Sequence, residues 1–184
     1  MRELRQLLND RDPSADWTSL IGSMVLQPYI VHVNYLVVGR RTYRPYDSHR
    51  GNGMVILSSR RLGDRVGRIV RIFSHLRRRP EWDELDREEE TFFRIELFAK
   101  VPSELARTLP WAEMVPSLCR VRPVFHRIDR SVVVSADEIS SHAATLLCPA
   151  GTVRRSDGAL VDEEILAVKD IQRVRALIVW ISLC

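Results

Sequence analysis

The chain has 184 residues, of which 45% are hydrophobic and 28% are charged, a composition typical of a globular domain rather than of a disordered or membrane protein. Its formal net charge of +4 is mildly basic, so nucleic-acid binding is permitted but not required. Of the 28 basic residues, Lys100 and Lys169 are the only lysines. An arginine fork suits phosphate and carboxylate groups, although a GC-rich coding sequence produces the same bias.

The three cysteines, Cys119, Cys148 and Cys184, are too few and too far apart for a disulfide framework or a zinc ribbon, which indicates a reducing compartment. The N-terminus lacks the apolar core of a secretory signal, and no apolar run reaches the roughly 18 residues of a membrane span. We therefore expect an intracellular protein that is not secreted and has no membrane partner.

The first residues predict a short helix, because Leu4, Leu7 and Leu8 have the spacing of one helical face and Asp12-Pro13 ends it. We interpret residues 1–28 as an N-terminal extension of the domain.

The first strand is predicted from Tyr29 to Val38, where apolar side chains alternate between two faces. Gly39 to Gly53 collects Gly, Pro, Asn, Asp and Ser, which is typical of a long turn-rich loop. Met54 to Leu57 then has the composition of a short buried strand.

Two apolar runs joined by a charged loop, from Arg65 to Phe98, form the centre of the predicted fold. In the first run, Val66 to Leu76, the apolar spacing fits a helical stripe better than a period of two. Its Val, Ile and Phe content nevertheless favours a strand. In the second run Phe93 and Ile95 share one face, so we predict that the two runs pair as strands.

Further strands are predicted at Cys119 to Phe125 and at Ser131 to Val134. Ser135 and Glu138 then have the spacing of a capping box, which predicts a short helix over Ile139 to Ala144. Ile165 to Val168 lies in a run with helical spacing but has the composition of a closing strand, and both possibilities stay open. The predicted core is Tyr35, Val70, Phe73, Phe93, Ile95, Val121 and Phe125.

These elements predict a mainly β fold, a small barrel of five to seven short strands with one short helix and helical or irregular terminal extensions. The barrel domain is expected over residues 29–151, and residues 152–184 are expected to be a closing strand or helix followed by an apolar tail. Ala176 to Cys184 carries no charge. It either covers the core as a helix or extends past a domain end near Gln172-Arg173, in which case the chain is part of a longer polypeptide.

The order of four segments resembles the bromo-adjacent homology (BAH) domain, most closely the BAH-like barrels encoded beside fungal transposable elements. The segments are Gly51 to Val55, Val66 to His75, Glu90 to Ile95, and Val132 to Val134 leading into Ile139 to Ala144. The resemblance covers roughly residues 29–151, and it also favours a domain end near Gln172-Arg173.

BAH domains mediate protein contacts on chromatin, and some read methylated lysine through an aromatic cage. The resemblance therefore implies a non-enzymatic module in the nucleus that binds chromatin or another protein, as part of a transposon-encoded or transposon-derived protein. The aromatic-Arg-Pro signature of chromatin BAH domains stands here as Phe93-Arg94-Ile95, without the proline, and the Asn-Glu motif is absent. No cage residues are carried over.

Charge is unevenly distributed along the chain. Twelve arginines and two acids lie between Arg40 and Arg79, whereas eight acids and two arginines lie between Glu81 and Glu96. A concentrated positive segment is typical of phosphate binding, which makes direct binding of DNA or RNA the alternative function. Equally, the acidic segment could fold back and neutralise the arginines.

Candidate binding residues fall in two groups. The first combines aromatic rings with arginines, which suits base stacking or the binding of a cationic side chain, although loop tyrosines also pack simply on a domain rim. The second is a run of three arginines. The residues are Arg40, Arg41, Tyr43, Arg44, Tyr46 and His49, and Arg77, Arg78 and Arg79.

Motifs of catalysis are missing from the sequence. His75, His126 and His142, or Cys119 with His126, lack the close spacing of metal ligands, and no phosphate-binding glycine loop or nucleophile elbow occurs. We expect neither an enzyme nor a cofactor, metal or small-molecule substrate. A third possibility, an enzyme whose scattered acids converge in space, requires three carboxylates or a His and Cys pair in one cleft.

Overall fold

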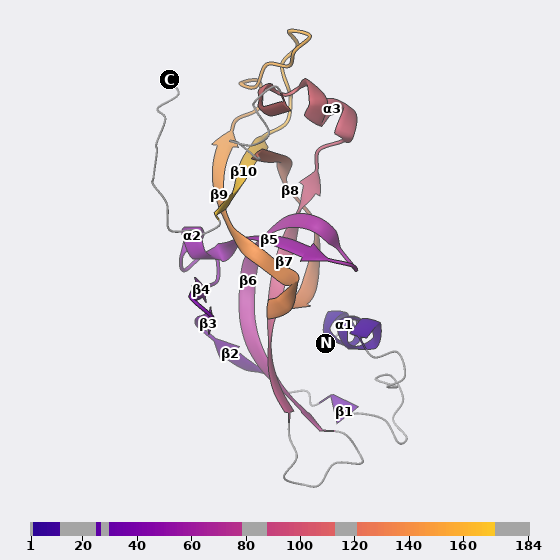
Figure 1. Cartoon of the computed structure of the whole chain (residues 1–184), viewed down its shortest axis with the longest axis vertical. Helices are drawn as coiled ribbons and strands as arrows, with labels where there is room; N and C mark the ends of the chain where they lie inside the picture. Colours follow the sequence, from indigo (N-terminus) through magenta and orange to yellow (C-terminus); the bar gives the residue numbers. More distant parts are fainter. Residues whose placement is uncertain (1, 12–24, 27–29, 79–87, 113–120, 172–184) are drawn as a thin grey trace.

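The computed structural model describes residues 2–11, 25–26, 30–78, 88–112 and 121–171 (Figure 1). The described helices are α1 (Arg2–Arg11), α2 (Arg50–Gly53), α3 (Ser103–Thr108) and the 3-10 turns η1 (Pro110–Ala112) and η2 (Ala136–Glu138). The described strands are β1 (Val25–Leu26), β2 (Val31–Val33), β3 (Leu36–Val38), β4 (Arg41–Tyr43), β5 (Met54–Ser59), β6 (Gly63–Arg78), β7 (Glu88–Lys100), β8 (Val121–Ser135), β9 (Ile139–Cys148) and β10 (Ile165–Ile171). The mainly β prediction is confirmed.

One large antiparallel sheet contains most of these strands. Pairing passes from β6 to β7, β8, β10, β9 and β5 and returns to β6, so the sheet is partly ringed (Figure 1). β1 and β2 pair with the later part of β6, and β3 and β4 form a separate hairpin. Three strands exceed the short length predicted from the sequence, because β6, β7 and β8 have 16, 13 and 15 residues.

The predicted pairing of the two central apolar runs is confirmed, because β6 and β7 pair antiparallel from Gly67↔Leu97 to Arg77↔Glu88. Gly67 is required in this pairing, since a Cβ there would lie 2.5 Å from the Ile95 Cγ2 and 2.8 Å from the Glu96 carbonyl oxygen.

A register shift between Ile69 and Arg71 explains why β6 resembles a helix in sequence. The extra residue at the shift, Val70, reverses the alternation of faces. Ile69 and Ile72, three residues apart, therefore both enter the same core cluster, with Phe93 and Ile95 of β7. Spacing by three is otherwise the mark of a helix.

The N-terminal helix α1 is confirmed, and it packs tightly on the sheet. Leu4, Leu7 and Leu8 are each about 1% exposed and form a cluster with three sheet residues, Phe73, Phe92 and Val133. The guanidinium of Arg11, at the end of α1, donates a hydrogen bond of 2.6 Å to Glu90 of β7. This segment thus contributes core side chains to the sheet.

The single strand predicted from Tyr29 to Val38 is wrong. The strand is interrupted at Asn34 and Tyr35. The part before them, β2, pairs with β6, and the part after them, β3, pairs with β4. Tyr35 is 53% exposed and is not a core residue. Among the other predicted core residues Phe73, Phe93, Ile95 and Phe125 are buried, whereas Val70 and Val121 are only partly buried.

The helix predicted over Ile139 to Ala144 is also wrong, because those residues belong to β9. The capping box exists, with the Ser135 N–H donating 3.2 Å to the Glu138 carboxylate, but it caps only the turn η2. β9 pairs with both β5 and β10, and this pairing overrides the local helix signal. The strand possibility at Ile165 to Val168 is confirmed by β10, and the two strands predicted between Cys119 and Val134 are one, β8.

Candidate functional site

The predicted binding residues lie in two places. Six belong to the turn between β3 and β4, to β4 and to the loop that follows: Arg40, Arg41, Tyr43, Arg44, Tyr46 and His49. Arg77 and Arg78 end β6, far along the sheet from the hairpin (Figure 1). Arg79 lies outside the described residues.

The β3–β4 hairpin is closed by a two-residue turn, Gly39-Arg40, with Val38 paired to Arg41. Gly39 has a φ of 61°, which only glycine adopts without strain and which two-residue hairpin turns require. A glycine and a polar residue between two runs of strand-forming residues is a hairpin signal. That signal was present in the sequence, although the prediction of a continuous loop from Gly39 passed over it.

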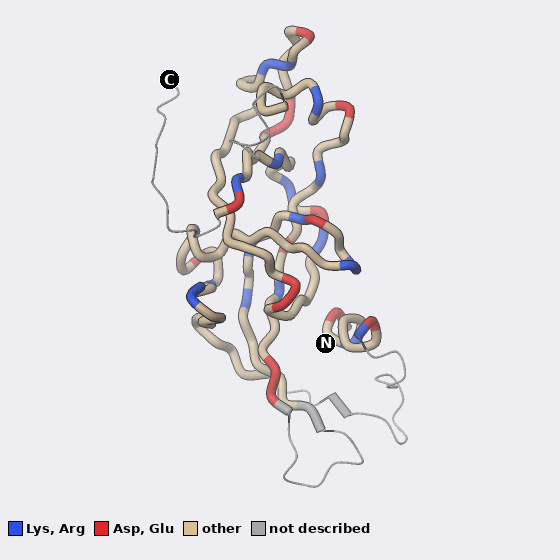
Figure 2. Tube along the Cα trace, in the orientation of Figure 1, with Lys and Arg blue, Asp and Glu red and all other residues tan. Residues whose placement is uncertain are grey.

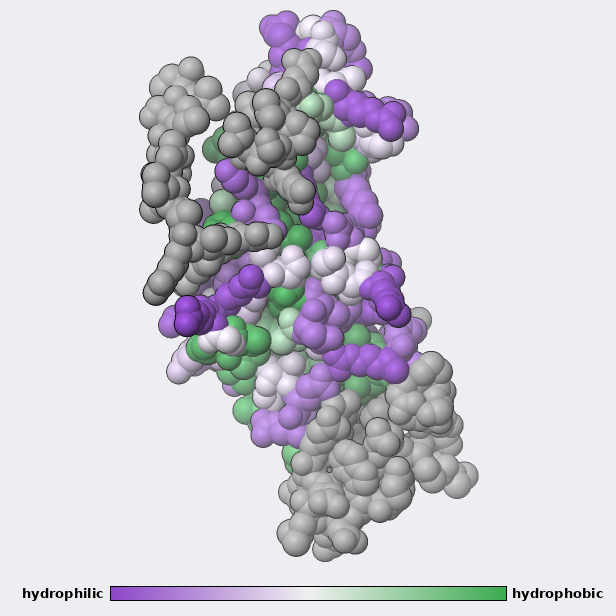
Figure 3. Space-filling model, viewed as in Figure 1, coloured by the Kyte–Doolittle hydropathy of each residue, from purple (hydrophilic) through white to green (hydrophobic). Residues whose placement is uncertain are grey.

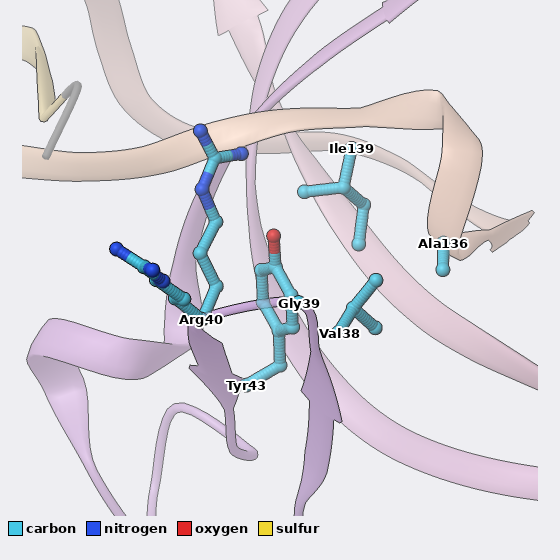
Figure 4. A pocket seen from close by; sticks show the side chains of 7 residues that line it. Val38, Gly39, Arg40, Tyr43, Ala136 and Ile139 are labelled. Carbon is cyan, nitrogen blue, oxygen red and sulfur yellow. The ribbon is translucent and has the colours of Figure 1, made fainter.

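Tyr43 attaches the hairpin to the large sheet (Figure 4). Its side chain is only 3% exposed, packs edge-on against Phe93 at 5.5 Å and stacks on the imidazole of His142 at 4.6 Å. The ring is therefore buried in packing contacts, and Tyr43 is not the rim aromatic that its loop context suggested.

Two hydrogen bonds, one from a side chain of each strand to the backbone of the other, hold β4 against β9. The His142 Nε2 lies 3.0 Å from the Thr42 carbonyl oxygen, and the Arg41 guanidinium donates to the Ser140 carbonyl oxygen. Both contacts fix the hairpin against the sheet on the β4 side.

Beside the hairpin lies a hollow of about 470 Å³. It is lined by Val38, Gly39, Arg40, Arg41, Tyr43, Ala136 and Ile139 (Figure 4). None of these seven residues is an acid, a histidine or a cysteine. The hollow combines apolar walls with arginines, which suits binding of a small apolar or acidic group.

The hairpin contains basic residues (Figure 2), and hydrophobic and hydrophilic side chains lie next to one another in its region of the surface (Figure 3). We call the exposed side chains of Tyr35, Val37, Val38, Arg40 and Arg44 the hairpin surface. Arg44 lies over the Tyr35 ring, with its Cζ 5.5 Å from the ring centroid. Among the residues that the structure describes, neither Arg40 nor Arg44 has a carboxylate partner. Both arginine side chains are exposed.

His49 and Tyr46 have local structural roles. The His49 Nδ1 accepts a hydrogen bond of 3.1 Å from the Asn52 N–H and so caps the short helix α2. Tyr46 packs on the core, with the Arg68 Cζ 5.7 Å from its ring centroid. The sequence placed both residues in a binding group, but their contacts here serve the fold.

Carboxylates neutralise the arginines at the centre of the positive segment. Arg61 lies 3.3 Å from Glu138, Arg65 lies 2.6 Å from Asp129, and Arg68 lies 2.8 Å from Glu96. The hydrogen bond from Arg65 lowers the pKa of Asp129. The positive segment is therefore not one open basic surface. The carboxylate partners of these three arginines belong to η2, β8 and β7.

Arg77 lies opposite Glu88 in the register of β6 and β7, and opposite Leu26 in the register of β1 and β6. Arg78 lies opposite Val25. These two arginines of the second predicted group therefore lie in register with, or next to, the acidic start of β7, which begins at Glu88.

The histidines do not assemble a catalytic or metal centre in the described ranges. The His126 Nδ1 lies 2.9 Å from Glu164, whereas His142 belongs to the hairpin contact and His75 is buried in β6. No group of three His, Cys, Asp or Glu side chains among the described residues is arranged to hold a metal ion. Cys119 lies outside those residues. The described helices include none with the length and apolar character needed to cross a membrane.

Comparisons of the chain with models of protein families, with curated proteins and with solved structures find no match.

Proposed function

We propose that this chain is a non-enzymatic recognition domain that docks on a protein partner through the hairpin surface. The observation that carries the proposal is the exposure of Val37 and Val38 next to Arg40 and Arg44, whose charges lack carboxylate partners within the described residues. Exposed apolar side chains with arginine at their rim are typical of protein interfaces. The hollow beside them gives such a surface a recess for a partner side chain.

The partly ringed sheet supports the further proposal that the fold is the small β-barrel of a BAH-like module. The segments that carry the resemblance fall on α2 and β5, on β6, on β7, and on β8 with β9, and each is paired with another. On this reading the partner is a chromatin protein, the protein acts in the nucleus, and it is encoded by or derived from a transposable element.

Direct binding of DNA or RNA is the second candidate, and the arginines of the hairpin favour it. Against it, Arg61, Arg65 and Arg68, at the centre of the positive segment, are paired with carboxylates and are less able to neutralise phosphates. Exposed arginines beside exposed valines suit a protein ligand better than a nucleic-acid backbone.

Binding to reconstituted mononucleosomes, compared with the same DNA free of histones, tests the proposal. We expect tighter binding to the nucleosome, because the partner is a protein, and a shallow dependence on salt. Reversing two charges in Arg40→Glu with Arg44→Glu should weaken this binding.

A matched control is Arg107→Glu with Arg154→Glu, which changes the net charge equally at exposed positions in α3 and in the connection between β9 and β10, at the top of Figure 1 and away from the hairpin. Equal affinity for free DNA with a steep loss in salt would support the nucleic-acid candidate instead. No binding to either, or equal weakening by both double variants, would refute docking on chromatin through the hairpin.

A further inference from the structure

The edge of β3 that faces away from β4 pairs with no strand in the described part of the chain. In an antiparallel hairpin with a two-residue turn, the residues flanking the turn exchange hydrogen bonds, and the next pair points its N–H and C=O groups away from the partner strand. Val38 and Arg41 flank the turn, so the outward-pointing pair is Val37 and Thr42.

The contacts of the hairpin agree with this alternation. The Thr42 carbonyl points outward from β4 and meets the His142 Nε2 at 3.0 Å. On the opposite edge, no hydrogen bond to the N–H or C=O of Val37 is formed by the described residues, and Val37 is 54% exposed. Of the two edges of this hairpin, one is fixed to the sheet, and the other, which we call the free edge, has no hydrogen-bond partner among the described residues.

The surroundings of the free edge indicate what would pair with it. Arg40 lies in the turn at one end of β3, Arg44 lies over Tyr35 at the other, and neither has a carboxylate partner in the described residues. Val38 faces the hollow, whereas Val37 faces the opposite side of the hairpin. A strand added here would direct alternate side chains to the hollow and to Val37.

We propose that the free edge of β3 binds an extended acidic segment of a partner protein, which adds a strand to the hairpin. Main-chain hydrogen bonds to Val37 supply affinity, and alternate side chains supply specificity. Acidic side chains on one face of the added strand meet Arg40 and the hollow, and apolar side chains on the other face meet Val37. This inference rests on the proposed function and names the chemistry of its partner.

A second copy of the chain fits the edge less well. Pairing of β3 with β3 would bring the arginines of two hairpins together, in a protein whose formal net charge is already +4. Like charges brought close together destabilise such a contact.

The test uses a fluorescent seven-residue peptide in which glutamate alternates with valine, and the same peptide with lysine in place of glutamate. The decisive variant is Val37→Pro, which removes the outward N–H and leaves the hydrogen bonds between β3 and β4 in place. Proline is tolerated at such a position, because the N–H of this edge-strand residue points away from the partner strand. Val37→Thr is the matched control, because it changes the side chain and keeps the N–H. Thermal unfolding establishes that both variants are folded.

We expect the glutamate peptide to bind, the lysine peptide not to bind, and Val37→Pro to weaken binding about tenfold or more while Val37→Thr has little effect. Equal binding to Val37→Pro and Val37→Thr, equal binding of both peptides, or no binding of the glutamate peptide would overturn strand addition. Self-association of the protein that is lost in Val37→Pro would assign the edge to a second copy and would also overturn it. If Arg40→Glu with Arg44→Glu weakens nucleosome binding but Val37→Pro does not, strand addition fails and the proposed function stands.

Discussion

The ring of Tyr43 lies stacked on the imidazole of His142, with the ring centroids 4.6 Å apart and the planes inclined by 20°. This contact joins β4 to β9, and the same tyrosine ring makes a T-shaped contact with Phe93 in β7. A single side chain therefore connects the small hairpin to two strands of the large sheet.

Tyr43→Ala should lower the free energy of unfolding by about 3–5 kcal/mol, the range for removing a buried aromatic side chain. Tyr43→Phe keeps both ring contacts and should cost much less. Urea unfolding of the two variants measures the difference. A loss below about 1 kcal/mol in Tyr43→Ala, within the range of ordinary surface changes, would contradict the anchoring role.

Leu7→Ala in α1 should lower the free energy of unfolding by about 2–5 kcal/mol, because Leu7 is buried against Phe73, Phe92 and Val133. Gln6→Ala is the control on the exposed face of the same helix and should change stability by less than about 0.5 kcal/mol. Both values come from chemical denaturation. Similar, small effects of the two changes would mean that α1 is a dispensable extension.

Asp129→Asn should destabilise the protein near neutral pH, because it removes a carboxylate whose Oδ2 lies 2.6 Å from the guanidinium of the buried Arg65. Arg65 lowers the pKa of Asp129 in the folded state, so the carboxylate stabilises the fold above its unfolded pKa of about 3.9. That contribution is lost as pH falls through the lower folded value.

The stability difference between the wild type and Asp129→Asn should therefore be present above about pH 4 and should shrink below it. Denaturation curves at a series of pH values measure this difference. A difference that stays constant as the solution is acidified would show that the ion pair is not its source.

Local pattern was sufficient to predict the helix α1 and the pairing of β6 with β7. The alternation around Phe93 and Ile95 is strong, and both residues are buried as expected. Spacing alone was misleading in β6, since the register shift at Val70 lets Ile69 and Ile72 share one core cluster. A bulge depends on the partner strand, so it leaves no mark of its own in a single sequence.

The candidate site was predicted less well, for a related reason. Tyr43, Tyr46 and His49 stand among glycines and arginines, a context typical of an exposed loop, yet each makes a contact that supports the fold. The partner of Tyr43 is His142, about a hundred residues further along the chain, and no local pattern reveals it. The local sequence likewise does not show that the β6 residues Arg65 and Arg68 are paired with Asp129 and Glu96, because these carboxylates come from other strands.

The pairing of β5 with β9 links Val55 to His142, and three strands, β6, β7 and β8, lie between these two in the sequence. During synthesis, β6, β7 and β8 can pair as each emerges, because they follow one another along the chain. β5 has no partner on its other side until β9 has been made. An unpaired apolar strand edge invites association with other chains, so the nascent protein is most exposed to aggregation in the interval between the two strands.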